Sequence, residues 1–92
     1  MLGMFAVSRA GHDKGRMYLV VRDEGDVVYL ADGKMRTLEN PKTKKKKHLQ
    51  VIKKDIDRIL MQKLVNGQKL YNEEIKHAIK IRANKEVTYV ES

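Results

Sequence analysis

The sequence contains no cysteine and no tryptophan, and it has one proline and one phenylalanine among its 92 residues. Without cysteine, disulfide bonds and zinc sites built on thiolates are excluded. The apolar runs are all short compared with the roughly 20 residues of a membrane-spanning helix. The first of them is broken by Arg9 and follows no basic segment, so we expect neither a signal peptide nor a membrane span. We expect a cytoplasmic protein that uses no metal ion and no cofactor.

Positive charge, by contrast, is abundant. Lysine and arginine number 20 and aspartate and glutamate 12, which gives a net charge of +8. A field of this sign on a small body attracts polyanions, and nucleic acid is the commonest partner of this kind. The same charge also serves solubility, but we favour nucleic acid. Hydrophobic residues make up 41% of the chain, which is enough for a single core at this length.

Brief apolar runs separated by polar turns fill the first part of the chain, as in small β-barrels and sandwiches. We predict five strands, at residues 5–7, 17–21, 27–31, 35–38 and 49–52. Alternation along the second strand gives two sets of side chains, one for each face: Met17, Leu19 and Val21, and Tyr18, Val20 and Arg22. We expect the two strand tyrosines, Tyr18 and Tyr29, to pack in the core rather than to stack on bases.

The dipeptide Asp32-Gly33 lies between two of these runs. It suits a two-residue type I′ hairpin, in which both central residues need positive φ. Residues 35–38 are therefore predicted as the returning strand, which ends before Pro41 because proline cannot donate to a ladder. The strand at 49–52 would then close the sheet and protect its edges.

The apolar period changes after residue 52, and two helices are predicted. Asp55 is the expected N-cap of the first, Gly67 its expected stop, and Asn72 the expected capping residue of the second. Their apolar faces consist of Ile56, Ile59, Leu60 and Leu64, and of Ile75, Ala78, Ile79 and Arg82. We divide the chain into residues 1–52 and a helical extension, 53–92, packed on the first part. Residues 86–92 are predicted as a short strand or a frayed tail.

The most informative segment runs from Val7 to Arg16, with the sequence VSRAGHDKGR. Its Gly-x-Asp-Lys-Gly-Arg portion, residues 11–16, resembles the KOW motif residue for residue. With residues 29–36 and the lysines after them, the chain is similar to ribosomal proteins of the L-fourteen-e kind and to short bacterial KOW-domain RNA-binding proteins. The resemblance covers residues 4–52. It implies an SH3-like barrel and an RNA-binding role in translation, although KOW loops also occur in transcription elongation factors.

The resemblance and the charge together suggest which residues contact RNA. Gly11 and Gly15 are expected to shape the loop, because glycine accepts positive φ. The run from residue 42 to 47 would be a solvated, mobile loop in the free protein and would neutralise phosphates when RNA is bound. The candidate RNA-binding residues are Arg9, His12, Lys14, Arg16, Lys34, Arg36, Lys42, Lys44, Lys45, Lys46 and Lys47. These side chains can form one RNA-binding surface only if the KOW loop and the Asp32-Gly33 turn are neighbours in space.

Catalysis is not expected from this sequence. Ser8, His12 and Asp13 are too close in sequence for a typical triad, and no oxyanion hole is indicated. The histidines lack metal-ligand spacing, and Gly11 and Gly15 do not match a phosphate-binding P-loop. We expect ribosomal RNA as the partner, with ribosomal proteins as possible neighbours and no small-molecule substrate. The alternative is an adaptor that docks on the ribosome or RNA polymerase through its barrel or its apolar helix faces.

Overall fold

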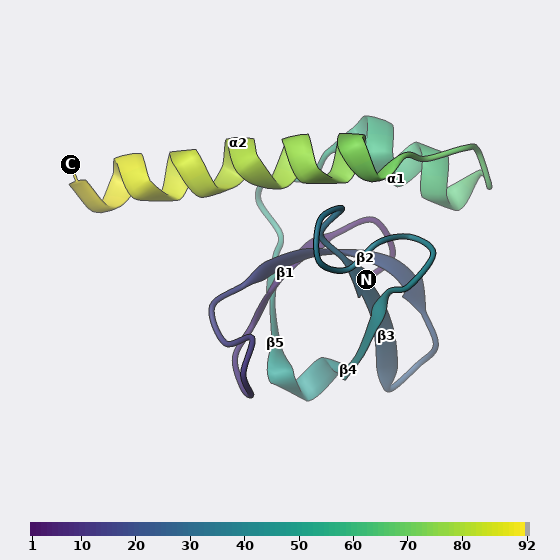
Figure 1. Ribbon diagram of the computed structural model, residues 1–92, viewed down its shortest axis with the longest axis horizontal. Coiled ribbons are helices and arrows are strands. Elements are labelled where there is room, and N and C mark those ends of the chain that lie inside the picture. Colours follow the sequence, from purple (N-terminus) through teal and green to yellow (C-terminus); the bar gives the residue numbers. More distant parts are fainter. Residues whose placement is uncertain (92) are drawn as a thin grey trace.

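The computed structural model describes the backbone of residues 1–91 and the side chains of residues 1–83. Five antiparallel strands form one sheet, and two helices follow it in the chain. Figure 1 shows both helices on the same side of the sheet. The elements are β1 (Phe5–Ser8), β2 (Met17–Asp23), β3 (Val27–Ala31), β4 (Lys42–Lys45), the 3₁₀ turn η1 (Lys46–His48), β5 (Leu49–Ile52), α1 (Arg58–Val65) and α2 (Asn72–Glu91).

The strand order is β4-β3-β2-β1-β5, so the last strand pairs with the first. β4 and β5 are the two edges of an open sheet, joined in the chain by η1. The expectation that residues 49–52 close the sheet is therefore wrong, although their assignment as a strand is confirmed. The sheet is strongly bent, which brings both edges to the same end of the molecule (Figure 1).

The predicted strand at residues 35–38 does not form, and residues 32–41 make a long loop instead. Gly33 has a φ of +78°, but no other residue type has positive φ in the part of the chain described, so a type I′ turn is absent there. The Asp32 Oδ1 atom accepts hydrogen bonds from the backbone N–H groups of Lys34 and Arg36, both at 2.8 Å. This side-chain competition for backbone donors holds a wider turn, and the partner of β3 is β4, after Pro41.

Both faces of the sheet bury apolar side chains, which explains why β1, most of β2 and β3 carry apolar residues at successive positions. One face packs Phe5 and Leu19 against the helices, and the other covers a second cluster that includes Tyr18 and Leu30. The core position of Tyr18 is confirmed, whereas Tyr29 is half-buried. A β-bulge between Val20 and Arg22 shifts the register. Arg22 therefore does not share the face of Tyr18, as predicted, but lies opposite Tyr29, with its guanidinium carbon 5.4 Å from the ring centroid.

Helix α1 begins two residues later than predicted. Its N-cap is Asp57, whose Oδ1 accepts hydrogen bonds from the N–H groups of Ile59 and Leu60. Asp55, the predicted cap, instead bonds to the guanidinium of Arg82. The predicted stop is confirmed, because Gly67 has a φ of +66° just past the last turn.

Helix α2 starts where predicted, but Asn72 does not cap it. The Glu74 carboxylate reaches back to the N–H of Tyr71, and the Asn72 Oδ1 atom accepts the N–H of Leu38 in the long loop. The predicted apolar face is confirmed, with Ile75 and Ala78 buried and Arg82 91% buried above the Phe5 ring. Residues 86–91 are helical, so neither a strand nor a frayed tail forms there, and Ser92 lies outside the described residues. Neither described helix combines the length and apolar character needed to cross a bilayer.

Candidate nucleic-acid interface

The loop between β1 and β2 is organised around the carboxylate of Asp13, which is only 6% exposed. Its Oδ1 atom accepts hydrogen bonds from the Ser8 hydroxyl at 2.8 Å and from the Lys44 ammonium at 2.6 Å. Its Oδ2 atom accepts the Tyr18 hydroxyl at 2.9 Å and forms an ion pair with Lys42 at 3.0 Å. Four donors from three strands therefore meet at one carboxylate and fix the loop to the sheet.

This network shifts two pKa values. Burial alone would raise the pKa of Asp13, but the hydrogen bonds from Lys44, Lys42, Ser8 and Tyr18 outweigh it and hold the pKa well below its usual range. Burial, together with the hydrogen bond to Asp13, raises the pKa of Tyr18 to about 12. The carboxylate is thus charged and the phenol neutral at all ordinary pH values.

The lysine run is not a loop, because it forms β4 and η1. Three of its cations are paired with acidic residues: Lys42 and Lys44 with Asp13, and Lys46 with Asp23 at 2.9 Å. The expectation of a mobile cationic arm is therefore wrong. The Asp13 cluster keeps one net positive charge, since two lysines share a single carboxylate. Lys45 and Lys47 point outward and are exposed.

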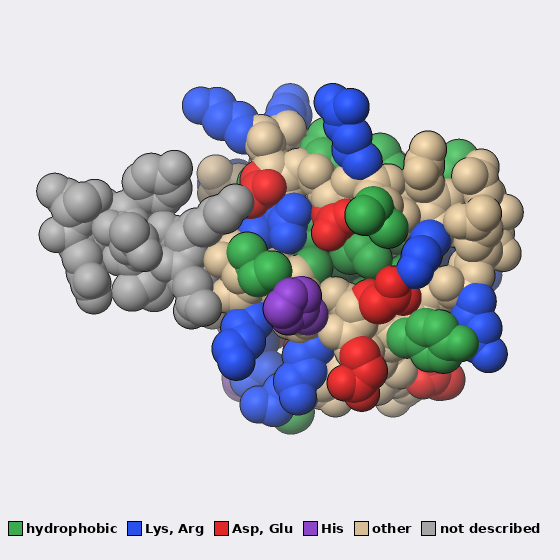
Figure 2. Space-filling model, turned by 90° about the horizontal axis from the view of Figure 1, so that it is seen from above, with side chains coloured by type: hydrophobic (Ala, Val, Ile, Leu, Met, Phe, Trp, Pro, Cys, Tyr) green, Lys and Arg blue, Asp and Glu red, His purple; other side chains and the backbone are tan. Residues whose placement is uncertain are grey.

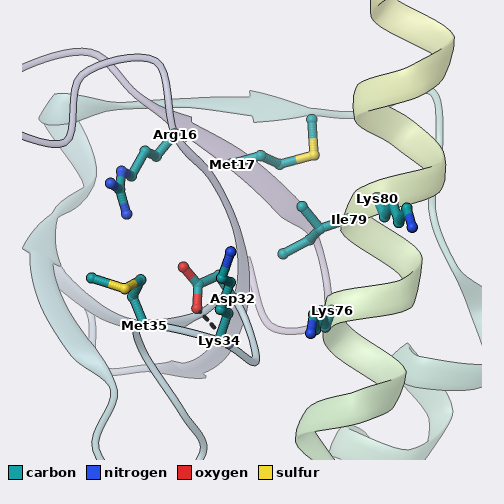
Figure 3. A pocket seen from close by; sticks show the side chains of 8 residues that line it. All are labelled: Arg16, Met17, Asp32, Lys34, Met35, Lys76, Ile79 and Lys80. Carbon is teal, nitrogen blue, oxygen red and sulfur yellow. Dashed lines mark hydrogen bonds between the residues drawn. The ribbon is translucent and has the colours of Figure 1, made fainter.

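A basic cleft with a volume of about 600 Å³ opens between the start of β2, the long loop and α2. Its cations come from the last residue before β2, from the long loop and from α2: Arg16, Lys34, Lys76 and Lys80. Met17, Met35 and Ile79 supply apolar surface, and Asp32 is the only acidic side chain among the described residues that line it. Figure 3 shows Met17 and Ile79 facing each other between sheet and helix, with Arg16 and Met35 across the opening.

A second, smaller hollow of about 320 Å³ adjoins the basic cleft, since Arg16 and Met35 line both. His12, Arg36 and Lys42 contribute its remaining basic side chains. The KOW-like loop and the Asp32-Gly33 turn are therefore neighbours, as the convergence of the predicted site requires. Together the two hollows form a continuous cationic surface along one side of the molecule, able to attract a polyanion.

The structure brings together only some of the predicted site residues. His12, Arg16, Lys34, Arg36 and Lys42 line the two joined hollows. Arg9 and Lys14 are exposed on the same β1–β2 loop, and Gly11 and Gly15 have positive φ, as expected of residues that shape it. The rest of the run lies elsewhere: Lys44 is inside the Asp13 network, and Lys45, Lys46 and Lys47 surround a separate hollow at Asp26.

Sequence reasoning missed Lys76 and Lys80 on α2. Their spacing of four residues puts them on one helix face, beside Ile79, which was the available signal. That face could not be assigned to the interface without knowing how α2 lies on the sheet. Figure 2 views the helix side and shows many Lys and Arg side chains around the outline, with acidic side chains both in the middle and along the lower edge.

No family model matches this chain, and no curated protein is significantly similar to it.

Proposed function

We propose that this protein binds structured RNA through the basic cleft and its adjoining hollow. The observation that supports this most strongly is that four cations from three separate elements line one open cleft, with a single acidic side chain among them. Cations that are held on a folded scaffold and form no ion pair with a carboxylate of the described residues suit phosphates, whose neutralisation releases counterions. Such contacts position the partner and carry little base information.

The strand order supports the SH3-like KOW barrel that the loop sequence suggested. The last strand pairs with the first, and one 3₁₀ turn joins the two edges of the bent sheet. In this proposal the β1–β2 loop presents Arg16, and the network around Asp13 keeps that loop rigid. The role of the lysine run is then divided: Lys42 faces the partner, and Lys44 holds the loop in place.

The test compares two double variants that each remove two exposed lysines. K76A/K80A changes the cleft, and K53A/K54A changes the segment between β5 and α1, which lines a different groove. K76A/K80A should bind an RNA hairpin more weakly. The fall of log K for binding with log salt concentration should also become less steep, by about two in the slope, whereas K53A/K54A should change affinity and slope little. Equal effects would show that net charge acts without a site. Absence of binding by the unaltered protein at low salt would overturn the proposal.

We further propose a place in the translation machinery, with ribosomal RNA as the target in the cytoplasm. This rests on the KOW-like loop together with the small size and basic surface of the protein. Sedimentation of cell extract should show the protein with ribosomal particles at low salt and its release at high salt. If it stays at the top of the gradient at low salt, the RNA it binds lies elsewhere.

An adaptor role is a second candidate, because part of the helix surface is apolar and exposed. Leu60 is buried as predicted, but Ile59 and Val65 are 66% and 63% exposed. They line a groove of about 820 Å³ together with Lys53, Lys54 and Arg58, a combination that suits a protein segment with apolar and acidic side chains. The variant I59E should abolish co-purification of such a partner but leave RNA binding intact. Unchanged co-purification would remove this candidate.

A further inference from the structure

The basic cleft is lined partly by apolar side chains, which do not bind phosphate groups. These apolar side chains, Met17, Met35 and Ile79, are called its floor. Met35 is 65% exposed, and its thioether lies across the opening from Ile79 and Met17 (Figure 3). A surface meant only for a phosphate backbone has no need of apolar side chains, since phosphates gain nothing from them. A flat aromatic group does gain, through burial of its face and through contact with methionine sulfur.

A negative charge also lies in this cleft. The Oδ1 atom of Asp32 is held by two backbone N–H groups of its own loop, whereas Oδ2 has no hydrogen-bond partner among the described residues. In Figure 3 the carboxylate lies between Arg16, Met35 and α2. An ionised carboxylate repels a phosphate at the centre of the cleft, but it accepts hydrogen bonds from the N–H groups of a base.

Cationic side chains surround the apolar floor of the cleft. Lys76 and Lys80 come from α2, Lys34 from the long loop and Arg16 from the residue before β2, so they flank the floor on more than one side. A cleft of about 600 Å³ is in the size range of small-molecule sites, which is roughly 300–1,000 Å³. The geometry thus offers phosphate contacts at the rim and room for one flat group between them.

From this arrangement we infer that the basic cleft accepts a single unpaired nucleotide of an RNA, with the base against Met35 and Ile79 and the neighbouring phosphates on the rim lysines and Arg16. This inference rests on the proposed function, because it names which part of an RNA enters the cleft. Unstacked bases in loops and bulges are available for such contacts, whereas bases inside an A-form helix are not.

Three RNA hairpins that differ at one position test the inference. The first is fully paired, the second has a single bulged nucleotide, and the third has an abasic residue in place of that bulged nucleotide. The abasic bulge keeps the phosphates and the flexibility of the bulge but lacks the base. We expect the protein to bind the base-containing bulge more tightly than the abasic one by a factor of about two to ten, the range of methionine–aromatic contacts.

Two matched variants assign that preference to the cleft. M35A removes an exposed apolar side chain from the floor, and V65A removes one of similar exposure, 63% against 65%, from the α1 groove. M35A should bring the affinities for the two bulged hairpins closer together and leave the fully paired hairpin unaffected, whereas V65A should change nothing. Both side chains are on the surface, so both variants should fold, which circular dichroism checks.

The outcomes separate the inference from the proposed function. Equal affinity for the base-containing and abasic bulges, with both bound, overturns the inference and leaves RNA binding in place. A preference for the base that is as large in M35A as in the unaltered protein also overturns it, because the base is then bound elsewhere. If none of the hairpins binds at low salt, the proposed function is lost, and the inference with it.

Discussion

At the scale of single residues, Asp13 has the largest influence on the site. It belongs to the KOW-like motif, yet its carboxylate faces inward and binds two lysines that sequence reasoning had assigned to RNA. Because its pKa is depressed in the folded state, the stabilisation from this ion pair network is fully present above the usual aspartate pKa of 3.8 and is lost as the pH falls below it. Tyr18 affects stability at high pH. Because its pKa is raised to about 12 in the folded state, the folded protein loses stability as the pH rises from about 10 to about 12.

The variant D13N should be strongly destabilised. The amide cannot neutralise Lys44, whose side chain is 10% exposed, so one buried charge remains without compensation. We expect a loss of about 3 kcal/mol in the free energy of unfolding at pH 7, measured by urea denaturation. The variant should also lose less stability than the unaltered protein when the pH is lowered from 7 to about 3, because its network has no carboxylate to protonate.

The control for D13N is D26N, at the exposed acid of the β2–β3 turn. Its cost should be within about 0.5 kcal/mol, as for most surface substitutions. Similar costs for the two variants would mean that Asp13 acts through net charge and not through its buried contacts.

At the scale of elements, the packing of α2 against the long loop determines where the cleft forms. Gly33 lies against the first turn of α2 so closely that a Cβ atom there would be 2.2 Å from the carbonyl oxygen of Asn72. The Asn72 side chain in turn bonds to the backbone N–H of Leu38 at 2.8 Å. These two contacts hold the loop and the helix together, and thereby place Lys34 and Lys76 in one cleft.

Replacing Gly33 by alanine should therefore displace α2. G25A is the matched control, because Gly25 also has a positive φ, +88°, but has open space around its Cα. Backbone strain alone should cost G25A about 1 kcal/mol, and G33A should lose about 2 kcal/mol more from the steric conflict. Urea denaturation measures both, and equal costs would show that the helix adjusts freely.

At the scale of the whole molecule, charge opposes folding. The radius of gyration is 12.4 Å, which is well below the Debye length of about 30 Å in 0.01 M salt and above that of about 8 Å at 0.15 M. At low salt every cation therefore repels every other, whereas at physiological salt only neighbours interact. The net charge of +8 makes this repulsion appreciable.

Thermal stability should accordingly rise when sodium chloride is increased from about 10 mM to about 200 mM. The variant K45A/K47A removes two exposed lysines of the run, so it should be more stable than the unaltered protein at low salt and respond less to added salt. Differential scanning calorimetry measures both. A fall in melting temperature with salt would mean that the ion pairs contribute more than the long-range repulsion.

Local patterns predicted the elements that depend on neighbouring residues. Four of the five strands, both helices, the stop at Gly67 and the apolar face of α2 follow from period, turn residues and burial. The prediction failed at residues 32–47, where a hairpin and a free lysine loop were expected. There the Asp32 side chain captures backbone donors, and Asp13, far away in sequence, binds the lysines. The capture of backbone donors by Asp32 is a local event that the hairpin interpretation overlooked, whereas the pairing of the lysines with Asp13 leaves no local signal.

The sequence by itself determined that the chain is basic, that it forms a small β-sheet followed by two helices, and that a glycine-containing loop with the sequence Gly-x-Asp-Lys-Gly-Arg joins the first two strands. Only the tertiary structure decided which cations form ion pairs with carboxylates of the described residues and which line the open cleft. The physical reason is that charge is a local property of a residue, whereas its compensation depends on contacts between segments about 30 residues apart, as between Asp13 and Lys44. The same holds for Lys76 and Lys80, which joined the cleft only because α2 is seated on Gly33.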